Sequence, residues 1–206
     1  MIYKTNELGK EGEIDFDQTN NEQNPFGACN VTSMIIWLWY RGHTFPQGKY
    51  EQPEDNLYDF IQTDPRVRQL YSEYIKNPNN KWAIGMPFER NHDLLSAATN
   101  WWMGKQVTKF SWGMPIPNII NEIKCGRPVV LNGYFQRPVK DPLGHIVVMV
   151  GYDDETRDVY LDDPYGQTYD WRPGVSGRNS KIPWELFIRD IKDPGNAQKK
   201  WAHFFL

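Results

Sequence analysis

The stretch NPFGACNVTSMIIWLWY, residues 24–40, places a cysteine between a loop and a helix. Turn-forming residues precede the cysteine and an apolar run follows it, which predicts a helix over 29–41 that Gly42 ends. A thiol at the start of a helix meets free backbone N–H groups and the positive end of the helix dipole, and both favour the thiolate. Cys29 is therefore a candidate nucleophile, and the alternative is a small buried side chain of the core.

The composition is that of an ordinary globular protein. The 206 residues carry a formal net charge of −3, and 39% of them are hydrophobic. This charge argues against a general nucleic-acid surface, and Cys29 and Cys125 make neither a disulfide framework nor a zinc knuckle. We expect one domain over 23–206, preceded by a polar extension over 1–22. Aromatic residues reach 15%, which suits a core and also a groove for peptides or sugars.

The N-terminal residues 1–20 are polar and acidic, without the apolar region of a signal peptide. We therefore expect a monomeric protein made in the cytoplasm, with no membrane span, that acts at a bacterial cell wall only after release by another route. We expect no cofactor and no metal. The histidines lack metal-ligand spacing, and the acidic segment 153–158 lacks the spacing of a calcium-binding EF-hand.

The order of predicted elements indicates an α+β fold. Helix-favouring segments dominate the first half of the chain, and β-rich runs bounded by turn residues dominate the second half. The segments expected to be helical are 29–41, 54–62, 66–76, 91–104, 115–126 and 182–191, and those expected to be strands are 105–112, 127–135, 144–153, 158–166 and 200–206.

A base for the candidate nucleophile is offered by His145. This histidine opens the apolar strand 144–153, and the next strand ends at Asp162 and Asp163. If the two strands form a hairpin, the start of the first lies opposite the end of the second, so His145 lies beside the two acids. Successive side chains of a strand point to opposite faces, so one of the two carboxylates can orient the imidazole.

Four segments resemble the C39-like branch of the papain-like cysteine peptidases. In that family a glutamine lies six residues before the nucleophile, as Gln23 does before Cys29, and an Asn-Asp-Pro segment carries the catalytic acid, which maps to Asp163. The segments, which extend the resemblance over about 20–206, are QNPFGACNVTS (23–33), IKCGRPVVLN (123–132), GHIVVMVGYD (144–153) and LDDPYG (161–166).

The resemblance implies a papain-like fold with the cysteine helix packed on an antiparallel sheet. It also implies a triad of Cys29, His145 and Asp163, with an oxyanion hole made by Gln23 and the backbone N–H of Cys29. Cys125 is expected to pack in the core or at its boundary, and Gly27 to let the backbone approach a substrate closely.

For the reaction, we expect hydrolysis of peptide-type amide bonds, with bacterial peptidoglycan as the substrate, as in an endolysin or a wall-degrading effector. Members of the family that process bacteriocins are fused to membrane transporters, and this sequence has no such segment. Three alternatives stay open. The chain could be a general protein-cleaving peptidase, an acyl transferase that uses the same thiol, or a non-catalytic module that binds peptides or sugars.

Overall fold

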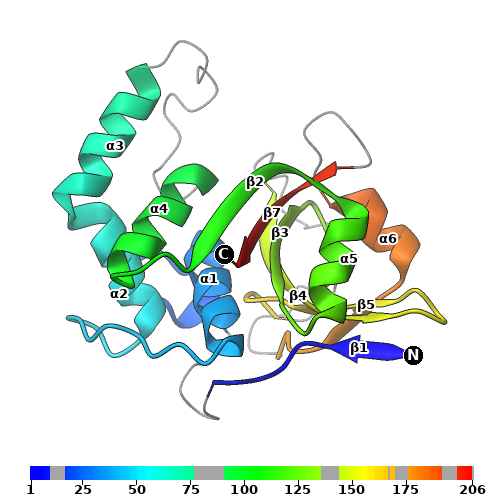
Figure 1. The fold of residues 1–206 in the computed structure, drawn as a ribbon. Coiled ribbons are helices and arrows are strands. Elements are labelled where there is room, and N and C mark those ends of the chain that lie inside the picture. The colour runs from blue at the N-terminus through cyan, green and yellow to red at the C-terminus, as the bar shows by residue number, and fades with distance from the viewer. Residues whose placement is uncertain are drawn as a thin grey trace.

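Helix α1 (Cys29–Tyr40) lies at the centre of the computed structural model, which describes residues 1–9, 17–76, 91–135, 144–166, 168–169, 176–191 and 199–205. All twelve residues of α1 are buried, because the sheet covers one side of the helix and other helices cover the opposite side (Figure 1). The helix ends as predicted at Gly42, whose φ of +68° suits glycine. The N–H groups of Gly42 and His43 donate to the carbonyls of Trp39 and Leu38, which closes the helix.

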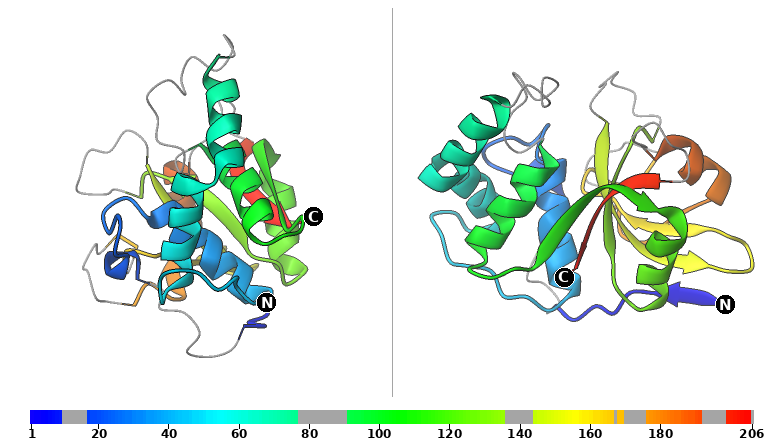
Figure 2. Two further views of the ribbon diagram at one scale, coloured as in Figure 1. Left: turned by 90° about the vertical axis from the view of Figure 1, so that its left-hand side faces the viewer. Right: turned by 45° about the horizontal axis from the view of Figure 1, so that its top comes forward.

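Three further helices extend the molecule beyond α1: the first of them contacts α1, the other two pack against the first, and the third also contacts the edge of the sheet (Figure 2). Proline begins the first two of them, where its missing N–H costs nothing, and the Asn91 side chain caps the third by accepting from the backbone N–H of Leu94. These helices are α2 (Pro53–Thr63), α3 (Pro65–Lys76) and α4 (His92–Trp102). They form the helical half of the molecule.

Seven strands in the described part of the chain form one antiparallel sheet. The order across the sheet is β2-β7-β3-β4-β5-β6, and β1 pairs with the far end of β4. The strands are β1 (Ile2–Lys4), β2 (Thr108–Pro115), β3 (Val129–Gly133), β4 (His145–Asp153), β5 (Val159–Asp162), β6 (Ser180–Ile182) and β7 (Lys199–Phe205).

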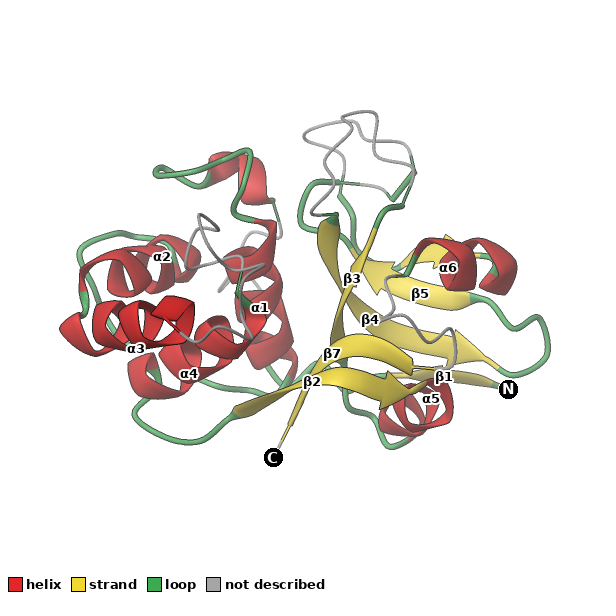
Figure 3. Cartoon of the chain, turned by 90° about the horizontal axis from the view of Figure 1, so that it is seen from above, coloured by secondary structure: helices red, strands yellow, loops and turns green. Residues whose placement is uncertain are grey.

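The sheet is buried on both faces, which explains why β3 and β4 are apolar at nearly every position. Side chains such as Val130 and Val148 pack in one cluster with α1, whereas Leu131 and Met149 pack in a second cluster on the opposite face. Two helices, α5 (Ile116–Lys124) and α6 (Trp184–Asp190), contribute to this second cluster. Viewed from above, the helical half and the sheet lie side by side, with α1 next to β3 and β4 (Figure 3).

The α+β fold and each of the predicted helices and strands are confirmed, with ends shifted by a few residues. Strands β1 and β6 were not predicted. Because β1 pairs with β4, the polar extension expected over 1–22 contributes to the sheet at residues 2–4, while residues 10–16 lie outside the described ones. The domain boundary at residue 23 stays a prediction. No helix among the described residues is both long enough and apolar enough to cross a bilayer.

Candidate active site

The loop before Cys29 is held by polar side chains. The Asn21 side-chain oxygen accepts hydrogen bonds from the backbone N–H groups of Gln23 and Asn24, which folds the chain into a turn. Helix α2 then fixes the turn from outside. The Gln23 amide donates to the Asp55 carbonyl at 2.9 Å, and the Asn24 amide donates to the Tyr58 hydroxyl at 3.2 Å.

Position 27 is a glycine for a reason of packing that the sequence did not reveal. A Cβ atom at this position would lie 2.6 Å from the Asn24 amide nitrogen, so any larger residue would displace the Asn24 side chain that is hydrogen-bonded to Tyr58. The N–H of Gly27 donates to the Asn24 carbonyl, which completes the turn that leads into α1. Its expected role in substrate approach stays a prediction.

Cys29 is the first residue of α1 and is 9% exposed. At this position the backbone N–H groups of the first helical turn and the positive end of the dipole surround the side chain, as the sequence predicts. The thiol interacts with His145 and contributes to the raised pKa of that histidine. The sequence-predicted nucleophile and base are therefore neighbours, one from each half of the molecule.

His145 begins β4 and is completely buried. Its Nε2 atom lies 2.6 Å from Oδ1 of Asp163, whose side chain is 1% exposed. The same carboxylate accepts hydrogen bonds from the Tyr165 backbone N–H at 2.9 Å and from the Thr168 hydroxyl at 3.0 Å. Asp163 is thus oriented by three donors and holds the imidazole in one position.

A register shift in the β4–β5 hairpin decides which acid meets His145. Gly151 pairs with Tyr160, but Val148 pairs with Asp162, so β4 carries one extra residue between Met149 and Gly151. A shift of one residue moves every following side chain to the other face of the sheet. The bulge therefore places Asp163 on the face of His145.

Asp162 points to the opposite face, toward α1. Its carboxylate accepts a hydrogen bond from the Tyr40 hydroxyl at 2.6 Å and from the Asn179 backbone N–H at 2.7 Å. Burial raises the pKa of Asp162 to about 6, and these two donors oppose the rise. Burial and the neighbouring carboxylate also raise the pKa of Tyr40. Asp162 therefore joins the end of α1 to the sheet, and Asp163 is the carboxylate beside His145.

The protonation of His145 follows from opposing effects. Burial lowers its pKa, but the charge of Asp163, the hydrogen bond to Asp163 and the interaction with Cys29 together raise the pKa to about 9. The geometry therefore favours an imidazolium at neutral pH, between a carboxylate and a sulfur atom. Such a pair can supply a thiolate and then return a proton to a leaving group.

Gln18 is a candidate residue that the sequence reasoning missed. It belongs to the short 3₁₀ helix η1 (Gln18–Asn20) and is completely buried. Its side-chain Nε2 donates to the Pro25 carbonyl in the cysteine loop at 3.0 Å, and its backbone N–H donates to the Pro164 carbonyl beside Asp163. Gln18 thus joins the segments that carry Cys29 and Asp163. Sequence reasoning chose Gln23 because of its spacing from Cys29 in the family motif. It missed Gln18 because residue types alone do not show which side chains of the polar stretch 17–24 are buried.

The remaining titratable residues of interest lie outside this site. Cys125 is exposed directly after α5, so the expectation that it packs in the core or at its boundary is wrong. His92 and His203 contact each other, with 2.9 Å between ring nitrogens, inside an aromatic cluster. No group of three metal-binding side chains occurs within the described ranges. The acidic turn 153–158 binds the N-terminal amine and Lys181.

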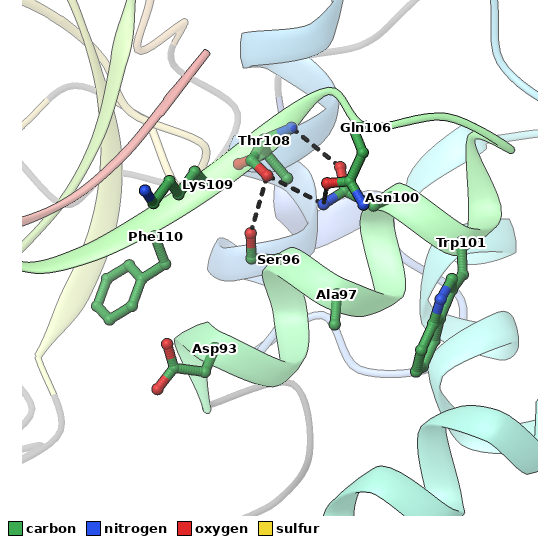
Figure 4. A pocket seen from close by; sticks show the side chains of 9 residues that line it. All are labelled: Asp93, Ser96, Ala97, Asn100, Trp101, Gln106, Thr108, Lys109 and Phe110. Carbon is green, nitrogen blue, oxygen red and sulfur yellow. Dashed lines mark hydrogen bonds between the residues drawn. The ribbon is translucent and has the colours of Figure 1, made fainter. Parts of the chain in front are cut away.

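A separate pocket of about 430 Å³ lies between α4 and the start of β2 (Figure 4). Its polar groups bond to one another. The Ser96 hydroxyl and the Asn100 amide both donate to the Thr108 carbonyl, and Asn100 also donates to Gln106. Neither Cys29 nor its partners line this pocket, so we assign it no part in the site.

Comparison with known proteins shows the family of the chain. The model of the Peptidase_C39 like family matches residues 13–186. A solved structure that is similar to the chain is that of a candidate C39-like peptidase from Bacillus anthracis, at 18% identity and a TM-score of 0.49, covering 95% of this chain and 94% of the other. No curated protein shows significant similarity to the sequence. Since the family model covers most of the chain, this protein belongs to the Peptidase_C39 like family and is a papain-like cysteine peptidase, a hydrolase.

Proposed function

We propose that Cys29, His145 and Asp163 form a catalytic triad that hydrolyses peptide-type amide bonds. One observation carries the proposal. A fully buried histidine interacts with the thiol at the start of α1 and lies 2.6 Å from a carboxylate that two further donors hold in place. A nucleophile, a base and an orienting acid in this order are what acyl transfer requires.

In the first step the Cys29 sulfur attacks the carbonyl carbon of the scissile amide and a C–S bond forms. The C–N bond then breaks, and the imidazolium of His145 gives its proton to the leaving amine. Water attacks the resulting thioester while His145 accepts its proton, which releases a carboxylic acid and regenerates the thiolate. Asp163 keeps the imidazole in the required tautomer and stabilises its positive charge.

The tetrahedral intermediate needs donors for its oxyanion, each worth about 2.7–4 kcal/mol in comparable sites. The Cys29 backbone N–H is one proposed donor. For the second, the sequence proposes Gln23, but its amide donates to the Asp55 carbonyl in the free protein. The Gln18 amide likewise donates to a backbone carbonyl, that of Pro25, but Gln18 is buried between the cysteine loop and the segment of Asp163, and this position makes it the favoured candidate.

For the substrate we keep the stem peptides of bacterial peptidoglycan as a proposal, which would make the enzyme an endolysin or another wall-degrading hydrolase. A protein substrate is the second candidate, and it is favoured by Phe26, an exposed aromatic side chain three residues before Cys29. In both cases the reaction is the same, and only the side chains around the scissile bond differ.

The test uses the wild type, Cys29→Ala and, as the matched control, Cys125→Ser, because Cys125 is the second cysteine and is exposed. Each protein is incubated with purified peptidoglycan and with casein in ¹⁸O-labelled water, and fragments are identified by mass spectrometry. We expect fragments from the wild type and Cys125→Ser but not from Cys29→Ala, with ¹⁸O in each new carboxyl group. Stem-peptide release supports the wall substrate, whereas casein cleavage with intact peptidoglycan contradicts it. Fragments from Cys29→Ala would contradict the triad.

A further inference from the structure

The pocket between α4 and the start of β2 is separate from the candidate active site, and one side of α4 forms a wall of it. Asp93, Ala97 and Trp101 line the pocket and follow one another at intervals of four residues, so they lie along the same side of the helix. Because an α-helix rises by about 1.5 Å per residue, this wall is about 12 Å long. The volume of about 430 Å³ lies within the usual range of small-molecule sites.

The two walls of the pocket are fixed to each other by Asn100. Its side-chain oxygen accepts from the backbone N–H groups of Val107 at 2.7 Å and Thr108 at 3.0 Å, and its amide donates to the Thr108 carbonyl at 3.0 Å. The Phe110 ring is held as well, because it stacks on His92 with 5.0 Å between ring centroids. The pocket is therefore built in the free protein, and a ligand would lose little affinity to ordering of its walls.

Asp93 uses only one of its two carboxylate oxygens to hold the fold together. The Oδ2 atom accepts hydrogen bonds from the Trp112 indole N–H at 2.8 Å and from the Tyr74 hydroxyl at 3.2 Å, which joins α3 and β2 to α4. Within the described part of the chain, no donor bonds to Oδ1 and no lysine or arginine pairs with the carboxylate. A half-buried carboxylate with one open oxygen is a favourable partner for an ammonium group.

Lys109 brings the opposite charge to the same pocket. Its side chain is exposed and forms no ion pair with any residue that the structure describes, Asp93 included. Figure 4 shows Asp93, Lys109 and Phe110 toward one end of the pocket and Trp101 at the other end. A simple cation would be repelled by Lys109, and a simple anion would be repelled by Asp93. A molecule with both an ammonium and a carboxylate group satisfies the two side chains together.

We propose that this pocket is a second binding site, which takes a short peptide with free ends. The amino end pairs with Asp93, the carboxyl end pairs with Lys109, and an apolar side chain packs between the rings of Phe110 and Trp101. Such peptides belong to the product class of the proposed hydrolysis. No triad residue lines the pocket, so the inference goes beyond the proposed function and does not depend on it.

The test measures binding, and not cleavage, by ¹⁵N–¹H NMR titration of the full-length Cys29→Ala protein. The probes are the dipeptide alanyl-phenylalanine, its N-acetyl form, which lacks the ammonium, and its C-terminal amide, which lacks the carboxylate. We expect the free dipeptide to shift the resonances of the Trp101 indole N–H and the Asn100 side-chain amide. Each blocked form should bind at least about tenfold more weakly, because one charged hydrogen bond is lost.

Two substitutions assign the ends of the peptide. Asp93→Asn should weaken the free dipeptide and the amide about tenfold and leave the N-acetyl form unchanged. Lys109→Gln should weaken the free dipeptide and the N-acetyl form and leave the amide unchanged. Asparagine keeps an acceptor oxygen for Trp112 and Tyr74, and Lys109 has no contact with a described residue to lose, so the second variant decides the question if the first does not fold.

The matched controls are Glu73→Gln and Lys105→Gln, which make the same changes of charge at exposed positions outside the pocket. Both should bind all three probes as the parent protein does. The inference is overturned if no shift occurs at about 10 mM dipeptide, if the three probes bind equally, or if the controls weaken binding as much as the pocket variants. Shifts confined to residues around position 29 would place the peptide in the active site and would also overturn it.

Discussion

Adjacent aspartates at the end of β5 have different environments, although they are chemically identical. Asp163 contacts His145, while Asp162 contacts Tyr40 on α1. The sequence predicted that only one of the two could orient the imidazole, and the family motif pointed to Asp163. The contacts agree with this choice, and the catalytic role itself awaits the kinetic comparison.

We predict that Asp163→Ala lowers kcat/KM at least about 100-fold, because the imidazole loses its orienting carboxylate. Asp162→Ala should change kcat/KM less than about threefold. It should lower the free energy of unfolding by about 1–3 kcal/mol, since the buried Tyr40 hydroxyl loses its acceptor. Steady-state kinetics and urea unfolding of both variants provide the check, and a larger kinetic loss in folded Asp162→Ala would reverse the assignment.

The raised pKa of His145 predicts a pH dependence. The folded-state pKa of about 9 lies above the ordinary value of 6.5. The contribution of the charged imidazolium to the stability of the folded protein is therefore fully present below pH 6.5 and is lost as pH rises through 9. We expect kcat/KM to fall over the same alkaline pH range, as His145 loses its proton. Asp163→Asn should move this fall to lower pH, since the charge of Asp163 then no longer raises the His145 pKa against the effect of burial, while Asp162→Asn should leave it in place. An unchanged fall in Asp163→Asn would contradict this explanation.

At the scale of elements, the helices and strands follow closely from local sequence signals. The apolar run of α1, the Gly42 stop and the prolines at the starts of α2 and α3 are each readable without the fold. The hairpin of β4 and β5 was also predictable from alternation and its turn. Its bulge was not, because a one-residue insertion has no composition signal, and that bulge decides which acid faces His145.

The short helix η1 is another element that the sequence did not reveal, and it carries Gln18. We predict that Gln18→Ala lowers kcat about 100-fold or more, as loss of an oxyanion donor does, and that Gln23→Ala has a small effect. Alkylation of Cys29 by iodoacetamide passes through no oxyanion, so Gln18→Ala should leave its rate unchanged. If alkylation falls together with kcat, Gln18 only braces the loop. If Gln23→Ala is the damaging change, the spacing of the family motif was the better guide.

Gly177 supports the segment that carries Asp163. Its carbonyl accepts from the Asp163 N–H, and a Cβ atom here would collide with the backbone carbonyl oxygens of Asp163 and Gly166. We predict that Gly177→Ala costs about 1–3 kcal/mol of stability and lowers kcat/KM at least about tenfold, since the segment must shift.

The control for Gly177→Ala is Gly104→Ala, at a φ of +65° with open space around it, after α4. It should lose stability through backbone strain and keep its kcat/KM. Thermal unfolding and kinetics of both variants decide the matter. Full activity in Gly177→Ala would show that the Asp163 segment tolerates displacement.

The whole molecule combines a helical half that carries Cys29 with a sheet half that carries His145 and Asp163. The α+β class was predictable from the order of helical and β-rich segments. The three residues were predictable as candidates from the order of the family motifs and from the pairing of two successive strands as a hairpin. The oxyanion candidate Gln18 was not predictable, because its burial arises from contacts with Pro25 and Pro164 that are remote from any local pattern. The same holds for the pairing of β1 with β4.

The covalent intermediate tests the central claim most directly. The wild type is mixed with its fastest-cleaved peptide, quenched in acid within milliseconds to seconds, and digested for peptide mapping by mass spectrometry. We predict a mass increase equal to the acyl half of the substrate, attached through a thioester to Cys29, and absent from Cys29→Ala. An acyl group on Cys125, or continued peptide cleavage by Cys29→Ala, would contradict the account.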